Sequence, residues 1–334
     1  MTVSVLTIAR CRETHLHNVI LGLSRQTRLP DEFVIGVMAD APYADLPPAP
    51  FPIRQVLVPG EPIPLAKARN AVARAAKGEA LIFVDVDCIP APELVEDYAG
   101  HLDHFDGVLM GEVLYLPKGA AQPGWRYETF AAIGVKHSDR QGPPAYGLKG
   151  CEDYRCFWSL NFALKAETFS RSGGFDETYS GYGGEDTDFG RTLDERAIPI
   201  AWCNGGRVYH QYHPHHMPPV HHVHSIVANS ERFCAKWGHH TMGHWLRCFR
   251  LMGLVTSDEN GFRVIREPGE PEFARTRQQA HQPYASSYHV LKALEAEAGL
   301  APSTKDKIAV GFDEDAADPL VQENTPPMAV IAAE

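Results

Sequence analysis

The chain has 334 residues, of which 44% are hydrophobic and 22% are charged, and its formal net charge at pH 7 is -11. This composition is typical of a globular enzyme and excludes fibrous, disordered and membrane-embedded proteins. The basic residues form no clustered stripe of the kind that binding to a phosphate backbone requires, so we expect no nucleic-acid partner.

The two ends of the chain and its cysteines give further expectations. Residues 1–8 lack a basic segment followed by a long apolar stretch, so they predict a first strand and not a signal peptide. No apolar run approaches the roughly 20 residues that a bilayer-spanning helix needs. The seven cysteines are odd in number and widely spaced, which favours reduced thiols in the cytoplasm. Residues 301–334 are rich in Ala, Asp and Pro and predict a disordered tail.

Short β-rich runs alternate with helical patterns over the first hundred residues, which is typical of βαβ units around a mostly parallel sheet. The predicted strands there are 3–8, 33–38, 54–58 and 80–84, and the predicted helices between them are 16–23 and 65–76. The later pattern predicts strands at 108–116 and 158–164, helices at 92–101, 185–195 and 225–237, and a Gly/Pro-rich loop at 118–150. A loop of that length is usually functional or disordered.

The tripeptide Asp85-Val86-Asp87 directly follows the buried strand 80–84. Ligands of open α/β sheets bind where strand ends and loops meet. Because residues i and i+2 of a strand face the same way, we expect the two carboxylates to converge on one point. Their repulsion is relieved when a divalent cation lies between them and a substrate diphosphate. The alternative is that two turn-favouring aspartates simply end a strand.

The segment Gly181-Tyr182-Gly183-Gly184 precedes the acids Glu185, Asp186 and Asp188. Glycines let a ligand approach the backbone closely, and acids at a helix start interact favourably with its exposed N–H groups. A carboxylate held there can act as a general base on an incoming hydroxyl. Helix capping alone also explains Glu185 or Asp188, but it does not explain the glycines before them.

Histidines crowd one segment, in which seven of fifteen residues are His210, His213, His215, His216, His221, His222 and His224. Any single one is more often a solvated or hydrogen-bonded loop residue than a ligand. One or two of them, however, would complete a cation site that begins with Asp87. The break at Met217-Pro218-Pro219 suggests a mobile flap that orders on donor binding and excludes water.

The joint order of these motifs resembles glycosyltransferase family two. The motifs are Gln26-Thr27 before Pro30, Ala68-Arg69-Asn70-Ala71, Asp85-Val86-Asp87, residues 161–167, Gly173-Gly174-Phe175-Asp176, Gly183-Gly184-Glu185-Asp186 and His210. The middle of the chain also resembles the galactosyltransferase-type C-terminal module. The likeness covers about residues 1–240, and the order of the motifs is far more specific than any one of them.

The resemblance implies an α/β fold of the GT-A type, with a Rossmann-like nucleotide-binding half, a mixed central sheet and a helical C-terminal region. It implies that the donor's nucleotide contacts Thr7, Ala9, Arg10, Asp40, Arg69 and Asp85. It implies metal ligation by Asp87 and Asp85, with His210 or His213 as the remaining protein ligand. Trp158 and Gly184 would line the sugar and acceptor sites, and Asp186 would be the catalytic base beside Glu185.

Two further features leave alternatives open. Cys151 and Cys156 could form a zinc site with nearby histidines, although a four-residue gap without a second pair is a weak signal. Residues 245–252 alternate arginines with large apolar side chains, as interfacial helices do, which allows peripheral contact with the inner face of a membrane. A helix packed on the catalytic domain is the favoured interpretation of that segment.

We therefore predict a nucleotide-sugar-binding half over 1–105, an acceptor and catalytic half over 106–222, and a helical region over 223–300. The predicted enzyme is an inverting hexosyltransferase that uses manganese or magnesium, with manganese favoured, and a UDP-sugar donor. Its acceptor would be a hydroxyl of a glycan, lipid or small molecule. The rivals are a nucleotidyltransferase, which usually needs a glycine-rich loop that residues 7–11 lack, and a non-catalytic zinc- or sugar-binding module.

Overall fold

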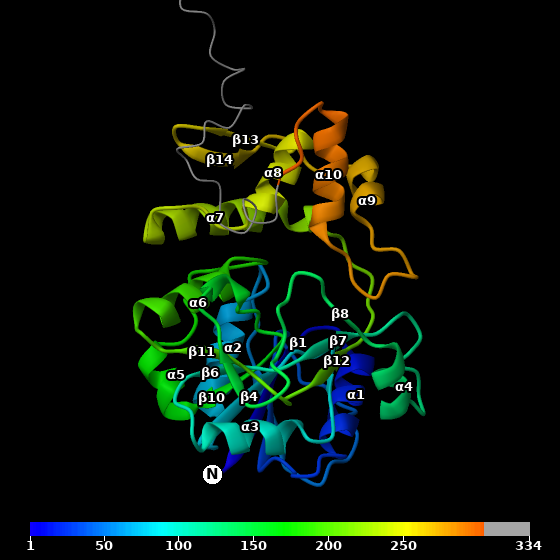
Figure 1. Ribbon diagram of the computed structural model, residues 1–334, viewed down its shortest axis with the longest axis vertical. Helices are drawn as coiled ribbons and strands as arrows, with labels where there is room; N and C mark the ends of the chain where they lie inside the picture. The colour runs from blue at the N-terminus through cyan, green and yellow to red at the C-terminus, as the bar shows by residue number, and fades with distance from the viewer. Residues whose placement is uncertain (304–334) are drawn as a thin grey trace, which may run out of the picture. The chain divides into compact units, whose positions relative to one another are not determined.

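The computed structural model describes residues 1–303, which divide into two compact units (Figure 1). The first unit comprises residues 1–215 and 277–285, and the second comprises 216–276 together with the described residues from Ser286 onward. The predicted tail lies, from residue 304, outside the described residues. The domain boundaries that the sequence suggests at 105 and 222 remain predictions.

An eight-stranded mixed sheet forms the centre of the first unit, in the order β3-β2-β1-β4-β10-β6-β11-β9. The parallel half consists of β1 (Val3–Ala9), β2 (Glu32–Val37), β3 (Ile53–Leu57) and β4 (Ala80–Val84). The mixed half consists of β10 (Asn161–Lys165), β6 (Val108–Met110), β11 (Ile200–Cys203) and β9 (Leu148–Gly150). Strand β10 is antiparallel to both β4 and β6, so it joins the two halves. The predicted α/β architecture with a mixed central sheet is thus observed.

Helices cover both faces of this sheet because successive side chains of each strand point to opposite sides. In β1, Val3 and Val5 pack into the core that contains α1 (Glu13–Leu23) and α3 (Leu94–Leu102). Leu6 and Ile8 pack into the core on the other face, which contains residues of α2 (Leu65–Ala75), α5 (Ala166–Ser172) and α6 (Glu185–Glu195). Figure 1 shows α1 and α2 on opposite sides of the sheet.

A second, smaller sheet has the order β5-β12-β7-β8. Its strands are β5 (Cys88–Pro90), β12 (Val208–His210), β7 (Val113–Tyr115) and β8 (Val135–Lys136). Phe130 of α4 (Tyr127–Ile133) packs with Trp125 and Tyr209 beside it. The expected single strand 108–116 is therefore wrong: β6 and β7 belong to different sheets, and the chain crosses between them at Gly111. The expected loop 118–150 holds α4, β8 and β9.

The second unit contains α7 (Val223–Trp237), α8 (Gly243–Leu251), α9 (Glu270–Thr276) and α10 (Ser287–Glu297). It also contains a hairpin of β13 (Val255–Asp258) and β14 (Gly261–Val264), which the expected helical region did not include. Arg247 of α8 is buried and donates to Glu295 of α10 over 2.7 Å. That arginine therefore does not lie on an exposed interfacial face.

None of the helices within residues 1–303 combines the length and the apolar character that crossing a bilayer requires.

The crossing between the two sheets depends on a glycine. A Cβ on Gly111 would lie 1.9 Å from the carbonyl oxygen of Gly206 and 2.6 Å from the hydroxyl of Tyr98. We expect Gly111→Ala to lower the free energy of unfolding by about 3 kcal/mol, because the backbone must shift to admit the methyl group. The matched control is Gly100→Ala in α3, where a Cβ meets nothing within 4 Å. Helix propensity predicts a gain of about 0.5 kcal/mol for the control. Urea denaturation of both variants checks this, and equal effects would contradict it.

Candidate functional site

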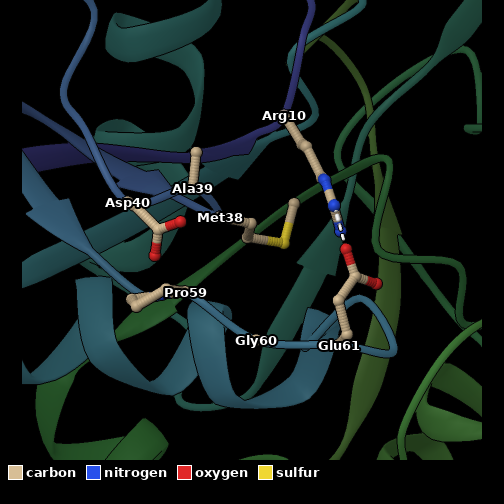
Figure 2. Close-up of a pocket in the computed structure, with 7 residues that line it drawn as sticks. All are labelled: Arg10, Met38, Ala39, Asp40, Pro59, Gly60 and Glu61. Carbon is tan, nitrogen blue, oxygen red and sulfur yellow. Dashed lines mark hydrogen bonds and ion pairs between the residues drawn. The ribbon is translucent and has the colours of Figure 1, made fainter.

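A cavity of about 410 Å³ opens where the parallel strands β1, β2 and β3 end. It is lined by Arg10 after β1, by Met38-Ala39-Asp40 after β2 and by Pro59-Gly60-Glu61 after β3 (Figure 2). Arg10 and Glu61 form an ion pair on one side of it, and Asp40 lies on the other. The carboxyl ends of parallel strands are where open α/β sheets bind ligands. Arg10 and Asp40 were expected here, whereas residues 59–61 were missed.

The two aspartates after β4 face different partners. The strand ends at Val84, and the Cys88 amide donates to the Asp85 carbonyl over 2.9 Å, so residues 85–88 form a turn. The two aspartates therefore do not lie on one face of a strand, as the sequence argument assumed. Asp85 lies 3.8 Å from Arg69, whereas Asp87 lies 4.0 Å from Arg12 and close to two histidines.

Strand pairing brings those histidines to Asp87. Strand β12 is antiparallel to β5, so His210 lies opposite Cys88, and the amide of the next residue, Gln211, donates to the Asp87 carbonyl over 2.7 Å. Nε2 of His210 lies 3.5 Å from Oδ1 of Asp87, and Nε2 of His213 lies 3.2 Å from Oδ2.

Asp87, His210 and His213 offer three ligand atoms that all lie within 4.8 Å of one another. Within residues 1–303 this is the one group of three or more His, Cys, Asp or Glu side chains with that spacing. Burial lowers the pKa of His210 to about 4, so its imidazole is neutral at pH 7, as a metal ligand must be. One carboxylate and two imidazoles suit manganese better than magnesium, which prefers oxygen ligands. Asp85 lies outside the group.

Arg69 of α2 gathers three carboxylates around one buried guanidinium. Its terminal nitrogens lie 3.2 Å from Glu185, 3.6 Å from Asp186 and 3.8 Å from Asp85. Burial raises the pKa of Asp85 to about 7, with Arg69 opposing the rise. Burial, together with the charge of Asp186, likewise raises the pKa of Glu185 to about 7. Arg69 was expected at the nucleotide, but it faces these acids and does not line the cavity.

The position of Asp186 is fixed by a second set of contacts. Its Oδ2 accepts from both the amide and the hydroxyl of Ser159, each over 3.0 Å. Its Oδ1 accepts no hydrogen bond from any residue of the described part, and the side chain is 27% exposed. Oδ1 itself is buried, so Ser159 orients the carboxylate and one of its oxygens keeps an unused acceptor position.

Glycines shape the turn that leads into these acids. Gly183 and Gly184 have φ of +91° and +93°, and Gly184 caps α6, whose first turn begins with Glu185. Other residues rarely adopt such φ values, so the chain can turn sharply into the helix here. The glycine run that helix capping did not explain is thus required by the backbone.

The remaining predicted site residues contribute neither to the lining of the cavity nor to the ligand group. Thr7 and Ala9 are buried in β1 and do not line the cavity. Trp158 precedes Ser159, and its ring lies 5.3 Å from that of His137. Cys151 and Cys156 interact as thiols but belong to no candidate metal group within the described residues.

Sequence reasoning missed Arg12, Ser159 and Tyr115. Arg12 lies 4.0 Å from Asp87, and the ring of Tyr115 stacks on that of His210 at 4.7 Å. The register of β7 on β12, which sets Tyr115 opposite His210, is a long-range pairing that no local pattern reveals. Arg12 could have been suspected from its place in the short connection between β1 and α1.

Two protein-family models match the chain. The model described as glycosyl transferase family 2 matches residues 60–160, and the one described as N-terminal domain of galactosyltransferase matches residues 147–215. Residues 60–215 therefore carry a glycosyltransferase family 2 domain followed by a galactosyltransferase-type domain, as expected.

Two similar proteins are a glucosyltransferase and a chondroitin synthase. Validoxylamine A glucosyltransferase of Streptomyces hygroscopicus subsp. limoneus is 26% identical over 262 residues, which cover 67% of this chain and 54% of that protein. Chondroitin synthase of Pasteurella multocida is 28% identical over 184 residues, which cover 45% of this chain and 18% of that protein. The matched regions thus span about half of the first relative and less than a fifth of the second.

The crystal structure of GalNAc-T7 with UDP, GalNAc and Mn2+ matches with a TM-score of 0.51 and 15% identity. The match covers 75% of this chain and 51% of that one. Together with the mixed sheet, it confirms the predicted GT-A fold.

The raised pKa of Glu185 gives a pH dependence of stability. Since the folded protein keeps this proton up to about pH 7, it binds more protons than the unfolded chain above about pH 4.5, and stability falls as pH rises through this window. In metal-free protein we expect the free energy of unfolding to fall between pH 5 and pH 8. This fall should be about 1–2 kcal/mol smaller for Glu185→Gln than for the wild type. The control is Glu195→Gln on the same helix, whose side chain is 61% exposed. Urea denaturation at both pH values decides it, and parallel pH slopes for all three proteins would refute it.

The ligand group gives a second prediction. We expect His213→Ala to weaken Mn2+ binding about tenfold or more, because it removes one of three protein ligands. His215→Ala is the matched control, since His215 lies on the same segment but outside the ligand group. Isothermal titration of the chain with MnCl2 measures both. Equal loss in the two variants, or none in His213→Ala, would remove His213 from the metal site.

Proposed function

We propose that this chain, which carries two glycosyltransferase domains in residues 60–215, transfers a sugar from a nucleotide-diphosphate donor to an acceptor hydroxyl with inversion. The observation that carries the proposal is the Arg69 cluster. It joins Asp85, which lies two residues before the candidate metal ligand Asp87, to Asp186, a carboxylate that Ser159 orients and whose Oδ1 accepts no hydrogen bond within the described residues. Displacement of a diphosphate by a hydroxyl requires both a cation site for the leaving group and a base for the hydroxyl.

The donor's nucleotide fits the cavity beyond β1, β2 and β3. That cavity offers the Arg10 guanidinium and the Asp40 carboxylate at the end of the parallel sheet. We infer uracil as the base, since the similarly folded GalNAc-T7 was crystallised with UDP and Mn2+. Arg12 follows β1 and lies 4.0 Å from Asp87, where its guanidinium would bind the donor's phosphates.

Asp87, His210 and His213 would hold the divalent cation, with manganese favoured over magnesium. When bound, such an ion neutralises the charge that develops on the departing diphosphate. The protein's own contribution is to hold the ligands: the pairing of β12 with β5 sets His210 beside Asp87, and Tyr115 stacks on the imidazole.

Asp186 would take the proton of the acceptor hydroxyl as it attacks the anomeric carbon. The two hydrogen bonds from Ser159 keep its carboxylate in one orientation, and a general base must be positioned in this way to act in the transition state. A single displacement with one base inverts the configuration at the anomeric carbon. The acceptor would be a glycan, lipid or small molecule, and the cytoplasm remains the predicted compartment.

A non-catalytic zinc- or sugar-binding module would need the histidines but not an oriented Asp186. A nucleotidyltransferase would form a diphosphate instead of releasing one. Release of UDP from a UDP-sugar by the wild type with MnCl2 separates both rivals from the proposal.

Asp186→Asn tests the mechanism itself. We expect kcat to fall by about 10²–10⁴, because general-base help is lost, while binding of UDP and Mn2+ stays within about twofold of the wild type, because the base acts only in the transition state. Asp194→Asn, on the exposed side of the same helix and paired with Arg191, serves as the control. UDP release and calorimetry give the two readouts.

Near-normal turnover by Asp186→Asn would show that this carboxylate is not the base. NMR of the product tests the stereochemistry separately, and retention of configuration would contradict a single displacement.

A further inference from the structure

Arg140 is a cation for which the described residues provide no counter-charge. It lies between β8 and β9, and its Cζ lies 5.1 Å from the ring centroid of Trp158 and 5.0 Å from that of Trp202. Both Nη atoms are buried, and neither donates a hydrogen bond to any acceptor within residues 1–303. The guanidinium is therefore held between two indoles with its terminal N–H groups unsatisfied.

The arginines that are buried as whole residues within the described part of the chain are paired. Arg69 lies near three carboxylates, and Arg247 donates to Glu295. The ionisable groups that interact most strongly with Arg140 are instead the phenols and thiols of Tyr115, Tyr98, Cys88 and Cys156. These groups carry little or no charge at neutral pH. Two aromatic faces attract a cation, but they offer no acceptor oxygens, and a buried charge without acceptors is costly.

The surroundings of Arg140 place it beside the proposed chemistry. Trp158, which stacks on it, immediately precedes Ser159, the residue that orients Asp186. The ring of His137 lies 5.3 Å from that of Trp158 and 5.5 Å from that of Tyr115, and Tyr115 in turn stacks on the candidate metal ligand His210. Arg140 contributes nothing to the lining of the nucleotide cavity at Arg10 and Asp40. Arg140 is thus linked through Trp158 to Ser159 and Asp186, the side of the site that we propose for the acceptor.

We propose that Arg140 binds a carboxylate carried by a substrate sugar, so that the chain acts on a uronic acid as donor or acceptor. This inference rests on the proposed function. A planar carboxylate matches the guanidinium fork with two parallel hydrogen bonds, and it supplies the negative charge that the protein does not. Trp158 then provides the apolar surface against which the sugar ring packs.

The experiment uses the full chain with MnCl2 and calorimetric titration of UDP, UDP-glucose and UDP-glucuronate. Arg140→Met keeps an unbranched side chain between the indoles but removes the charge, and Arg140→Lys keeps the charge but loses the fork. Arg126→Met is the matched control, because Arg126 is exposed and pairs with Glu128. If the donor carries the carboxylate, we expect the wild type to prefer UDP-glucuronate over UDP-glucose by about 30-fold or more. Both Arg140 variants should lose most of this preference, with unchanged affinity for UDP.

A second experiment tests whether the acceptor, and not the donor, carries the carboxylate that Arg140 binds. Methyl β-D-glucuronide and methyl β-D-glucoside are titrated into the complex with UDP and MnCl2, and into the free chain. If the acceptor carries the carboxylate, the donors bind alike, whereas the glucuronide binds more tightly than the glucoside in the wild type and not in Arg140→Met.

The outcomes against the proposal are distinct. If Arg140→Met weakened the binding of UDP as much as that of UDP-glucuronate, the guanidinium would be assigned to the diphosphate. No preference for either glucuronate in the wild type would overturn the carboxylate site, and a lower melting temperature of unliganded Arg140→Met would then assign Arg140 to packing. The carboxylate site predicts an equal or higher melting temperature, because an uncompensated charge is removed. Failure of the wild type to bind UDP would contradict the proposed function instead, and the free-chain titration with the two glycosides would still decide the carboxylate site.

Discussion

The candidate site depends on one buried ion-pair cluster, in which Arg69 of α2 neutralises Asp85, Glu185 and Asp186. Like charges this close repel, and burial penalises each of them, as the raised pKa values of Asp85 and Glu185 record. Removing the cation would leave buried acids uncompensated. The end of β4 and the start of α6 are therefore held together by electrostatics that packing alone would not supply.

The cluster also connects the two matched domains. Arg69 and Asp85 belong to residues 60–160, which match the family 2 model, whereas Glu185 and Asp186 belong to residues 147–215, which match the galactosyltransferase-type model. Strand β10 makes the same connection in the backbone, since it pairs with both β4 and β6. The proposed leaving-group site thus follows β4, and the proposed base is hydrogen-bonded to Ser159 just before the neighbouring strand β10, which is how a displacement reaction can keep its reactants aligned.

Charge is distributed unevenly over the site. Four carboxylates lie near Arg69 and Arg12, and three potential metal ligands lie at Asp87, as the proposed binding of a cation and a diphosphate requires. Arg140 stands apart from this balance, because the described residues give it aromatic faces but no acid. A stable protein keeps such a charge at a cost in stability, and functional sites are where that cost is usually found.

The sequence by itself determined the strands and helices of the parallel half, because a buried strand and an amphipathic helix each have a local period. The order of short motifs along the chain also predicted chemical roles for Asp87, Asp186 and His210, and these roles stay predictions. Local patterns did not show that residues 85–88 turn, so that Asp85 meets Arg69 while Asp87 meets the histidines. They did not show that Gly111 divides one apolar run between two sheets, or that Arg140 lies between Trp158 and Trp202. These facts depend on pairings between residues far apart in the chain, whose energies arise only when the strands are brought together, and so only the tertiary structure decided them.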